Sequence, residues 1–310
     1  MNIVPDNIDF GKYVRETEAR QRVKPARHYV ADLVERLGKP VIHRGHSLPW
    51  GKARGLFRFR PGEVTLWAGV NGHGKSLLSG MVMLSLIAQR QKTCIASFEM
   101  KPHSTLERMM RQWVGYPAHA EFAAHPEAIQ AMRELYEQFG IVTDGSLWFY
   151  DQQGTVTSDQ MIGVARYCAK ELGIKHLVID SLMKCVRGAD DYNGQKNFVD
   201  ELTAIARDYE THIHLVHHIR KLENEQKKPD KTDVKGAGEI TDMVDNVLLV
   251  WRNKSDQIGR KPDEPDAALI CCKQRHGEWE GGINLWFDRD SQQFVETNGG
   301  SIINFSEMCT

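Results

Sequence analysis

The chain has 310 residues, of which 41% are hydrophobic and 26% are charged, and its formal net charge is −1. This composition is ordinary for a soluble globular protein and excludes a polycation, so any contact with nucleic acid must come from local basic loops. The six cysteines show no C-x-x-C spacing, and no apolar run is long enough to span a bilayer. Because no signal peptide is evident, we expect free thiols and a reducing, cytoplasmic location.

The first 45 residues are expected to form an arm and a linker helix. Residues 1–24 are polar and mixed in charge, which is typical of a poorly ordered arm. Residues 25–37 carry apolar side chains at helical spacing, and Gly38 and Pro40 then end the pattern. So short a helix needs a docking surface, either on its own domain or on a neighbouring subunit.

Strands and helices alternate from residue 46 to residue 297, the expected main domain, before a tail at 298–310. We predict strands at 63–68, 93–98, 147–150, 176–179 and 212–217, and helices at 77–89, 103–114, 124–139 and 196–210. A further helix is expected to begin after a capping box formed by Thr157 and Gln160. This alternation predicts an α/β fold with a mostly parallel, doubly wound sheet. Short connections in the last third favour antiparallel edge strands at 247–252, 267–273, 283–288 and 292–296.

The stretch from Gly69 to Ser76 matches G-x-x-x-x-G-K-S, the phosphate-binding P-loop. Its flanks are a predicted strand and a predicted helix, so the loop's backbone N–H groups and the helix dipole can hold an anion. Lys75 is expected to reach the β- and γ-phosphates of a nucleotide, and the Ser76 hydroxyl to ligate Mg²⁺. The expected nucleotide-binding residues are Gly69, Asn71, Gly72, His73, Gly74, Lys75, Ser76 and Leu77, where His73 is expected to offer mainly its backbone.

A second candidate site is Asp180, the acidic residue that follows the apolar strand 177–179 as in a Walker B motif. Carboxyl ends of parallel strands line the ligand crevice, so Asp180 is expected beside the Mg²⁺ held by Ser76. Ser181 follows Asp180 where many ATPases carry a catalytic glutamate, so the base must lie elsewhere. Glu99, at the end of strand 93–98, is our candidate for orienting the attacking water. The alternative is a solvated surface carboxylate.

Two further groups of cationic or titratable residues lie at the ends of predicted strands. His217 and His218 end strand 212–217, where one could contact the γ-phosphate or both could be structural. Lys273 and Arg275 share one face of a late strand, which favours an anion there, such as a nucleotide bound by the adjacent subunit. The alternative is a solvated basic hairpin tip.

Two basic loops could contact a nucleic-acid backbone. The first carries Lys184 and Arg187, and the second runs from Arg220 to Lys235 with Gly236 and Gly238 close behind. Lysines and exposed N–H groups suit the phosphates of a single strand, although a solvated loop is the alternative.

Taken in order, these motifs resemble the RecA-like motor domain of DnaB-type ring helicases, including the phage and Twinkle-like branch, over residues 47–296. The resemblance rests on the P-loop, Phe98-Glu99-Met100, Asp180, His217-His218, the 235–238 stretch and Lys273-Gln274-Arg275. It implies a RecA-like P-loop NTPase fold, ATP and Mg²⁺ as cofactors, and ATP hydrolysis coupled to unwinding of DNA during replication.

The resemblance also assigns roles to single residues. It implies Glu99 as catalytic base and His218 as sensor. It also implies that Lys273 and Arg275 reach the neighbour's γ-phosphate, with Arg275 as arginine finger, and that the 235–238 stretch grips the DNA. Helix 25–37 matches the family's linker helix.

The implied partners are single-stranded DNA, further copies in a hexameric ring, and a separate primase or loader. Only about 45 residues precede the motor here, so we expect no N-terminal scaffold or primase domain. The expected helicase is of phage or plasmid type. A RecA- or RadA-like recombinase and an accessory ATPase that binds a protein partner remain alternatives.

Overall fold

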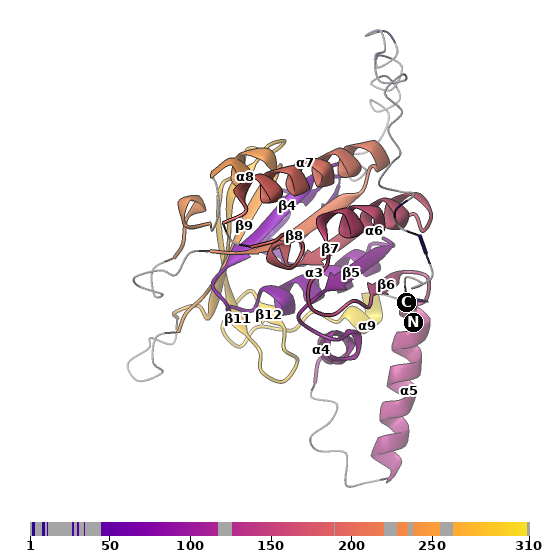
Figure 1. The fold of residues 1–310 in the computed structure, drawn as a ribbon. Helices are drawn as coiled ribbons and strands as arrows, with labels where there is room; N and C mark the ends of the chain where they lie inside the picture. Colours follow the sequence, from indigo (N-terminus) through magenta and orange to yellow (C-terminus); the bar gives the residue numbers. More distant parts are fainter. Residues whose placement is uncertain are drawn as a thin grey trace.

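The structure, a computed structural model, describes residues 2–3, 8–9, 11, 27, 30, 34, 45–116, 126–188, 190–219, 228–234, 238–254 and 263–308 (Figure 1). Most of the expected arm and of the helix at 25–37 lies outside these residues, and so do Lys235 and Gly236. In the described part, no helix is both long and apolar enough to cross a bilayer.

A ten-stranded sheet forms the centre of the molecule, in the order β1-β6-β5-β7-β8-β4-β9-β10-β11-β12. Its strands are β1 Asn2–Ile3, β4 Val64–Gly69, β5 Thr93–Ser97, β6 Leu147–Tyr150, β7 His176–Asp180, β8 His212–His218, β9 Asn246–Arg252, β10 Ala267–Gln274, β11 Gly281–Phe287 and β12 Phe294–Val295. Pairing is parallel from β1 to β9 and antiparallel from β9 to β12. A separate antiparallel pair joins β2 His46–Ser47 to β3 Arg58–Phe59.

Helices cover both faces of the sheet (Figure 1). One face packs against α6 Ser158–Lys170 and α7 Tyr192–Tyr209, with α8 Gly238–Met243 beside them. The other packs against α3 Lys75–Ala88, α4 Pro102–Val114, the end of α5 Pro126–Thr143, and α9 Phe305–Met308. The 3₁₀ turns are η3 Gly51–Ala53, η4 Leu182–Lys184 and η5 Lys231–Asp233. Figure 1 shows α5 projecting away from the body of the sheet.

Alternation along the strands builds two apolar cores. On β4, Leu66 belongs to the core under α6 and α7, whereas its neighbour Trp67 belongs to the core under α3 and α4. Successive side chains of a strand point to opposite faces, so a strand covered on both sides is apolar throughout. All six residues of β4 are buried. This two-sided burial confirms the predicted α/β, mostly parallel, doubly wound sheet.

The strand β9 differs from its prediction. We expected the last third to be antiparallel, but β9 pairs parallel with β4 and antiparallel with β10. The chain between β8 and β9 passes through η5 and α8, which gives the long crossover that a parallel strand needs. The antiparallel part of the sheet therefore begins one strand later, at β10.

The predicted helix starts at 77, 103 and 124 lie within two residues of the observed starts of α3, α4 and α5. The Thr157 hydroxyl accepts the backbone N–H of Gln160 at 3.2 Å, which confirms the predicted cap of α6. Helix α7 begins at Tyr192, four residues before its predicted start at 196, because the Asp191 carboxylate caps it by accepting the N–H of Gly194. The five described cysteines are free thiols, as predicted.

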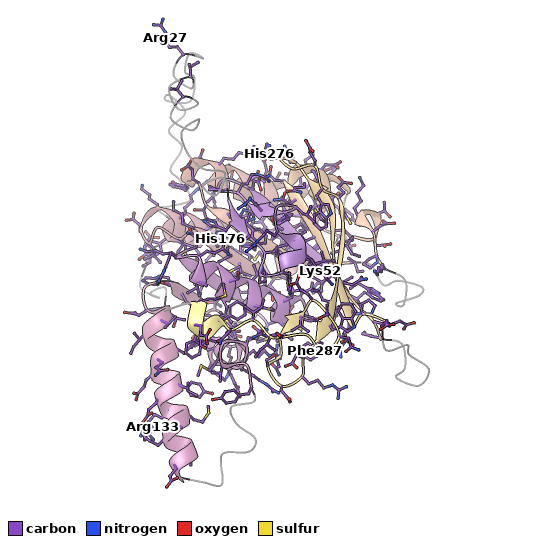
Figure 2. The ribbon with its side chains drawn as sticks, turned by 180° about the vertical axis from the view of Figure 1, so that it is seen from behind. Arg27, Lys52, Arg133, His176, His276 and Phe287 are labelled. Carbon is purple, nitrogen blue, oxygen red and sulfur yellow. The ribbon has the colours of Figure 1, made fainter. Side chains whose placement is uncertain are left out.

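A line of buried histidines crosses the sheet near the amino ends of its strands. The Trp67 indole N–H donates to His214 Nδ1 (3.1 Å), His214 Nε2 meets His176 Nδ1 (3.0 Å), and His176 Nε2 meets His46 Nδ1 (2.9 Å). Because an indole only donates, each ring must accept at Nδ1 and donate at Nε2. Figure 2 shows His176 inside the body of the protein. Burial lowers the pKa of His176 and His214 well below the usual range, so the line is neutral.

Candidate active site

The P-loop connects β4 to α3 and depends on two glycines. A Cβ on Gly69 would lie 2.5 Å from the Val250 carbonyl oxygen, so only glycine allows β4 to end against β9. Gly74 has φ +86° and precedes the first residue of α3, a conformation that glycine adopts without strain. The loop therefore directs backbone N–H groups and the start of a 14-residue helix toward one point.

Lys75 lies folded back on this loop. Its Nζ donates to the carbonyl oxygens of Gly69 (2.8 Å) and Val70 (3.1 Å), and the residue is 7% exposed. Burial lowers the pKa of Lys75, and the charges of Asp180 and Glu99 partly offset that effect. A buried ammonium held by carbonyl oxygens gains a stronger partner when a phosphate arrives.

Ser76 and Asp180 meet across the crevice. The Ser76 hydroxyl donates to Asp180 Oδ2 at 2.7 Å, and Asp180 is 6% exposed. Burial raises the pKa of the Asp180 carboxyl and nearby Glu99 adds to this, whereas the Ser76 hydrogen bond and Lys75 oppose it. A hydroxyl and a carboxylate are the hard oxygen ligands that Mg²⁺ accepts, and Mg²⁺ typically takes few ligands from the protein. The residues present therefore fit a magnesium ion.

A cavity of about 520 Å³ opens beside these residues. Its lining comprises Asn71, Gly72, Gly74, Lys75, Ser76, Leu77, Glu99, Arg108, Asp180, His218, Arg252 and Gln292. Glu99 reaches it because the Phe98 N–H donates to the Asp180 carbonyl at 2.9 Å, which holds the ends of β5 and β7 together. The structure thus brings the predicted base, the P-loop and the Walker B acid to one cavity.

The two strand-end histidines separate into different environments. His218 pairs in register with Gly69 and lines the cavity, whereas His217 is buried with no exposed surface. Of the two histidines, His218 is the one that lines the cavity, and its implied sensor role stays a prediction.

His73 does more than was expected from the sequence. Its side chain is 1% exposed, and Nδ1 accepts the backbone N–H of Arg252 at 3.2 Å. The imidazole thus ties the P-loop to the end of β9. This contact is possible because β9 lies directly beside β4. The role of the His73 backbone at a phosphate stays a prediction.

Three cavity-lining residues were missed from the sequence: Arg108, Arg252 and Gln292. Arg252 ends β9, so the strand-end reasoning that found Glu99 could have found it. Arg108 lies on α4, and Gln292 precedes β12. Neither residue belongs to a recognisable sequence motif.

Lys273 and Arg275 lie at the opposite end of the sheet. Gln274 pairs with Asn246, which pairs with Thr65 near the start of β4, whereas the P-loop follows the end of β4. At about 3.3 Å per residue, Val64 and Gly69 are separated by roughly 16 Å. Neither Lys273 nor Arg275 lines the nucleotide cavity of its own chain. Both side chains contact the backbone at the end of α8. Lys273 Nζ donates to the carbonyls of residues 241, 242 and 244, and Arg275 Nη2 donates to those of residues 242 and 243.

The predicted DNA-contacting residues are only partly described. Lys184 ends η4 directly after β7, and exposed Arg187 lines a cavity of about 380 Å³ between α6 and α7. Asp159, Asp191 and Glu201 line the same cavity, so the surroundings of Arg187 include acidic residues. Gly238 begins α8, and its neighbours Lys235 and Gly236 lie outside the described residues.

The sequence is similar to a described protein family and to several characterised proteins. Residues 55–296 match the family described as DnaB-like helicase C terminal domain. The replicative DNA helicase DnaB of Helicobacter pylori (strain J99) is 24% identical over 250 residues, covering 79% of this chain and 50% of the relative. A Twinkle homolog of Arabidopsis thaliana is 22% identical, covering 69% of this chain and 31% of the relative. The chain thus spans half or less of the length of these curated relatives.

Solved structures share the fold. The ATPase domain of G40P superposes with a TM-score of 0.72 at 16% identity, covering 87% of this chain and 97% of that one. A DnaB-like replicative helicase, solved in a study of its interactions with primase, gives a TM-score of 0.69 at 15% identity, covering 88% and 67%. The predicted RecA-like core is confirmed by these likenesses. With the family match over most of its length, the chain belongs to the DnaB-like helicase C-terminal domain family.

Proposed function

We propose that this chain is the ATP-driven motor of a replicative DNA helicase that moves along single-stranded DNA. The observation that carries the proposal is the shared cavity, where Lys75, Ser76, Asp180 and Glu99 meet. These are the groups that a phosphoryl-transfer site requires for binding, charge neutralisation and orientation of water. Membership of the DnaB-like family directs that chemistry toward DNA unwinding.

The residues divide the work of hydrolysis. Lys75 exchanges the carbonyl oxygens of Gly69 and Val70 for the β- and γ-phosphates. Ser76 and Asp180 would hold Mg²⁺, which supplies positive charge against the phosphates. Glu99 accepts a hydrogen bond from water and orients it for in-line attack on the γ-phosphate. His218, level with Gly69 across β4 and β8, contacts the same phosphate.

A neighbouring copy completes the site. Lys273 and Arg275 lie at the other end of β4 from their own P-loop, so they can serve a nucleotide bound by an adjacent subunit. Head-to-tail contacts of this kind form a ring when the rotation between subunits closes. We propose a hexameric ring with nucleotides between subunits and with DNA contacted by Lys184, Arg187, Lys235, Gly236 and Gly238.

The biological setting follows from the same proposal. Such a motor would act in the cytoplasm of a bacterial or phage-infected cell, in replication of phage or plasmid type, with a separate primase or loader as partner. Within the chain, residues 46–297 would form the motor, residues 1–45 an N-terminal arm and linker helix, and residues 298–310 a tail.

The test is ATP hydrolysis with and without single-stranded DNA. We expect DNA to raise the rate, and Lys75→Ala to abolish hydrolysis, because the ammonium that binds the phosphates is lost. Lys175→Ala removes an exposed lysine outside the cavity and should retain the rate. An ATP hydrolysis rate that does not change when single-stranded DNA is added would instead favour the accessory ATPase. Open helical polymers seen by electron microscopy would favour the recombinase.

A further inference from the structure

Asp245 is a buried carboxylate outside the nucleotide cavity, at the turn between α8 and β9. It is 2% exposed and takes no part in the chemistry described so far. We propose that Asp245 is the positioning residue that fixes Arg275 in the orientation needed at the adjacent subunit's nucleotide. This inference rests on the proposed function, since it concerns a site shared between copies.

The carboxylate of Asp245 joins Arg275 to the start of β4. Asp245 Oδ1 lies 3.2 Å from Arg275 Nε, and Oδ2 accepts the backbone N–H of Val64 at 2.9 Å. The backbones are joined in the same way, because Asp245 N donates to Val64 O (3.0 Å) and Arg275 N donates to Asp245 O (2.9 Å). Arg275 is thus held by its side chain and its backbone to the strand that leads to the P-loop.

The remaining contacts of Arg275 fix the plane of its guanidinium. One amino group, Nη2, donates to the carbonyl of Asp242 at 3.0 Å. The ion pair between Nε and Asp245 and this hydrogen bond use one edge of the planar group, and Nη1 has no acceptor among the described residues. The side chain is 39% exposed. A fixed plane with its second amino group directed away from these partners suits a phosphate brought by another molecule.

Burial makes this arrangement stiff. A carboxylate removed from water must be hydrogen-bonded and paired with a cation, or its charge is costly. Asp245 meets this requirement through Val64 N–H and Arg275, so loss of the Arg275 contact would leave the charge poorly compensated. Arg275 therefore stays on Asp245 instead of swinging into solvent.

A second cation on Asp245 provides a matched control. Arg207 Nη2 lies 3.9 Å from the same Oδ1, and its side chain is 57% exposed. An exposed ion pair at that distance contributes little. Removing Arg207 changes the charge around Asp245 without touching the Arg275 contact.

The first experiment measures steady-state hydrolysis in the presence of single-stranded DNA. Asp245→Asn retains the size and one oxygen for Val64 N–H but loses the charge that holds Arg275. We expect kcat to fall by about tenfold or more with KM for ATP changed by less than about twofold, since an arginine finger stabilises the transition state rather than ground-state binding. Arg207→Gln should keep the wild-type kcat. A wild-type kcat in Asp245→Asn would overturn the inference.

The second experiment mixes two variants and measures whether activity is restored. A misfolded variant could not restore activity in this way. Asp245→Asn subunits keep their own P-loop, and Lys75→Ala subunits keep a correctly held Arg275. Mixed rings therefore contain interfaces with both intact halves, and hydrolysis should exceed the sum of the two separate variants. Arg275→Ala mixed with Lys75→Ala is the reference for a shared site.

The mixture of Arg275→Ala with Lys75→Ala separates the role of Asp245 from the existence of a site shared between subunits. Recovery with Arg275→Ala but not with Asp245→Asn would overturn the role of Asp245 and leave the proposed function intact. Absence of recovery in both mixtures would contradict the shared site itself. If Asp245→Asn does not fold, Arg275→Lys replaces it, since lysine keeps the charge but loses the Nε contact. The same loss of kcat and the same recovery are then expected, and wild-type activity would refute the proposal.

Discussion

Lys75, Asp180 and Glu99 form a cluster of charged side chains at the cavity beside the P-loop. Burial lowers the pKa of Lys75 and raises that of Asp180, so each charge is costly in this crevice. The carbonyl oxygens of Gly69 and Val70 compensate Lys75, and Ser76 compensates Asp180. Phosphate and Mg²⁺ would replace these neutral partners with full charges, which couples nucleotide binding to rearrangement of the loop.

Replacing Glu99 with glutamine tests its role as base. The amide keeps the size of the side chain but cannot accept the water's proton, so Glu99→Gln should lower kcat by about a hundredfold or more while ATP still binds. Single-turnover hydrolysis and binding of a fluorescent ATP analogue would separate these two effects. Glu127→Gln, an exposed glutamate on α5, should behave as wild type. Normal turnover by Glu99→Gln would remove Glu99 from the mechanism.

Single residues were predictable where a strand ends at the cavity. Glu99, Asp180 and His218 were found from the sequence because parallel strands direct their carboxyl ends to one edge. Arg108 was not, since a position on a helix face depends on how α4 packs, which sequence spacing does not reveal. The side-chain role of His73 escaped for a similar reason, because it depends on β9 lying beside β4.

At the scale of elements, the histidine line connects β2, β7 and β8 at the end of the sheet remote from the P-loop. Phe59 packs edge-on against the rings of His176, His212 and His214. Each ring donates to the next, and the Trp67 indole at the end of the line has no lone pair to accept a proton. Protonating any ring of the line at Nδ1 would therefore break the hydrogen bond that this nitrogen accepts.

Acid should therefore weaken the fold through these histidines. Burial lowers the pKa of His46 to about 4, with the charge of Arg58 adding to this, and burial lowers that of His212 to about 3 although its bond to the Arg60 carbonyl opposes the change. Unfolded histidines bind protons below about pH 6.5, so stability is complete above that pH and falls as the pH drops toward the folded values. The slope is at most about 1.4 kcal/mol per pH unit for each fully buried histidine.

Urea unfolding at pH 7.5, 6.5 and 5.5 measures this slope. His46→Gln keeps an acceptor for His176 but removes one titrating group, so the loss of stability between pH 6.5 and 5.5 should be smaller than in wild type. His103→Gln, at an exposed position of α4, is the control and should keep the wild-type slope. Equal slopes in all three proteins would contradict this account.

The order and type of the elements were largely predictable, but the role of β9 was not. Apolar runs flanked by turn residues located the strands, and capping residues located α6. Short connections suggested that β9 joins an antiparallel edge. Its parallel pairing with β4 depends on α8 acting as a crossover, and so short a helix gives a weak sequence signal.

At the scale of the whole molecule, the two ends of β4 serve two different nucleotides in the proposed ring. One end leads to the P-loop, and the other holds Asp245 and Arg275. Figure 2 shows His276, the neighbour of Arg275, at the periphery of the body. Opposite ends with complementary halves of a site require a head-to-tail assembly, which closes into a ring or continues as a filament.

The family resemblance seen in the sequence at 47–296 agrees with the family match at 55–296. Motif order carried that prediction, because each motif has a fixed place on the sheet. The division into arm, motor and tail stays a prediction, as does the docking of helix 25–37, since a docking partner on another subunit leaves no trace in the spacing of one chain.

ATP-dependent unwinding of a forked DNA tests the central claim most directly. The duplex should be displaced when ATP and Mg²⁺ are present, and Lys175→Ala should displace it equally well. Lys75→Ala should leave the duplex intact under the same conditions, because the motor no longer binds the phosphates that drive it. Displacement by Lys75→Ala, or intact duplex with a wild-type protein that hydrolyses ATP on DNA, would contradict the account of this chain as a helicase motor.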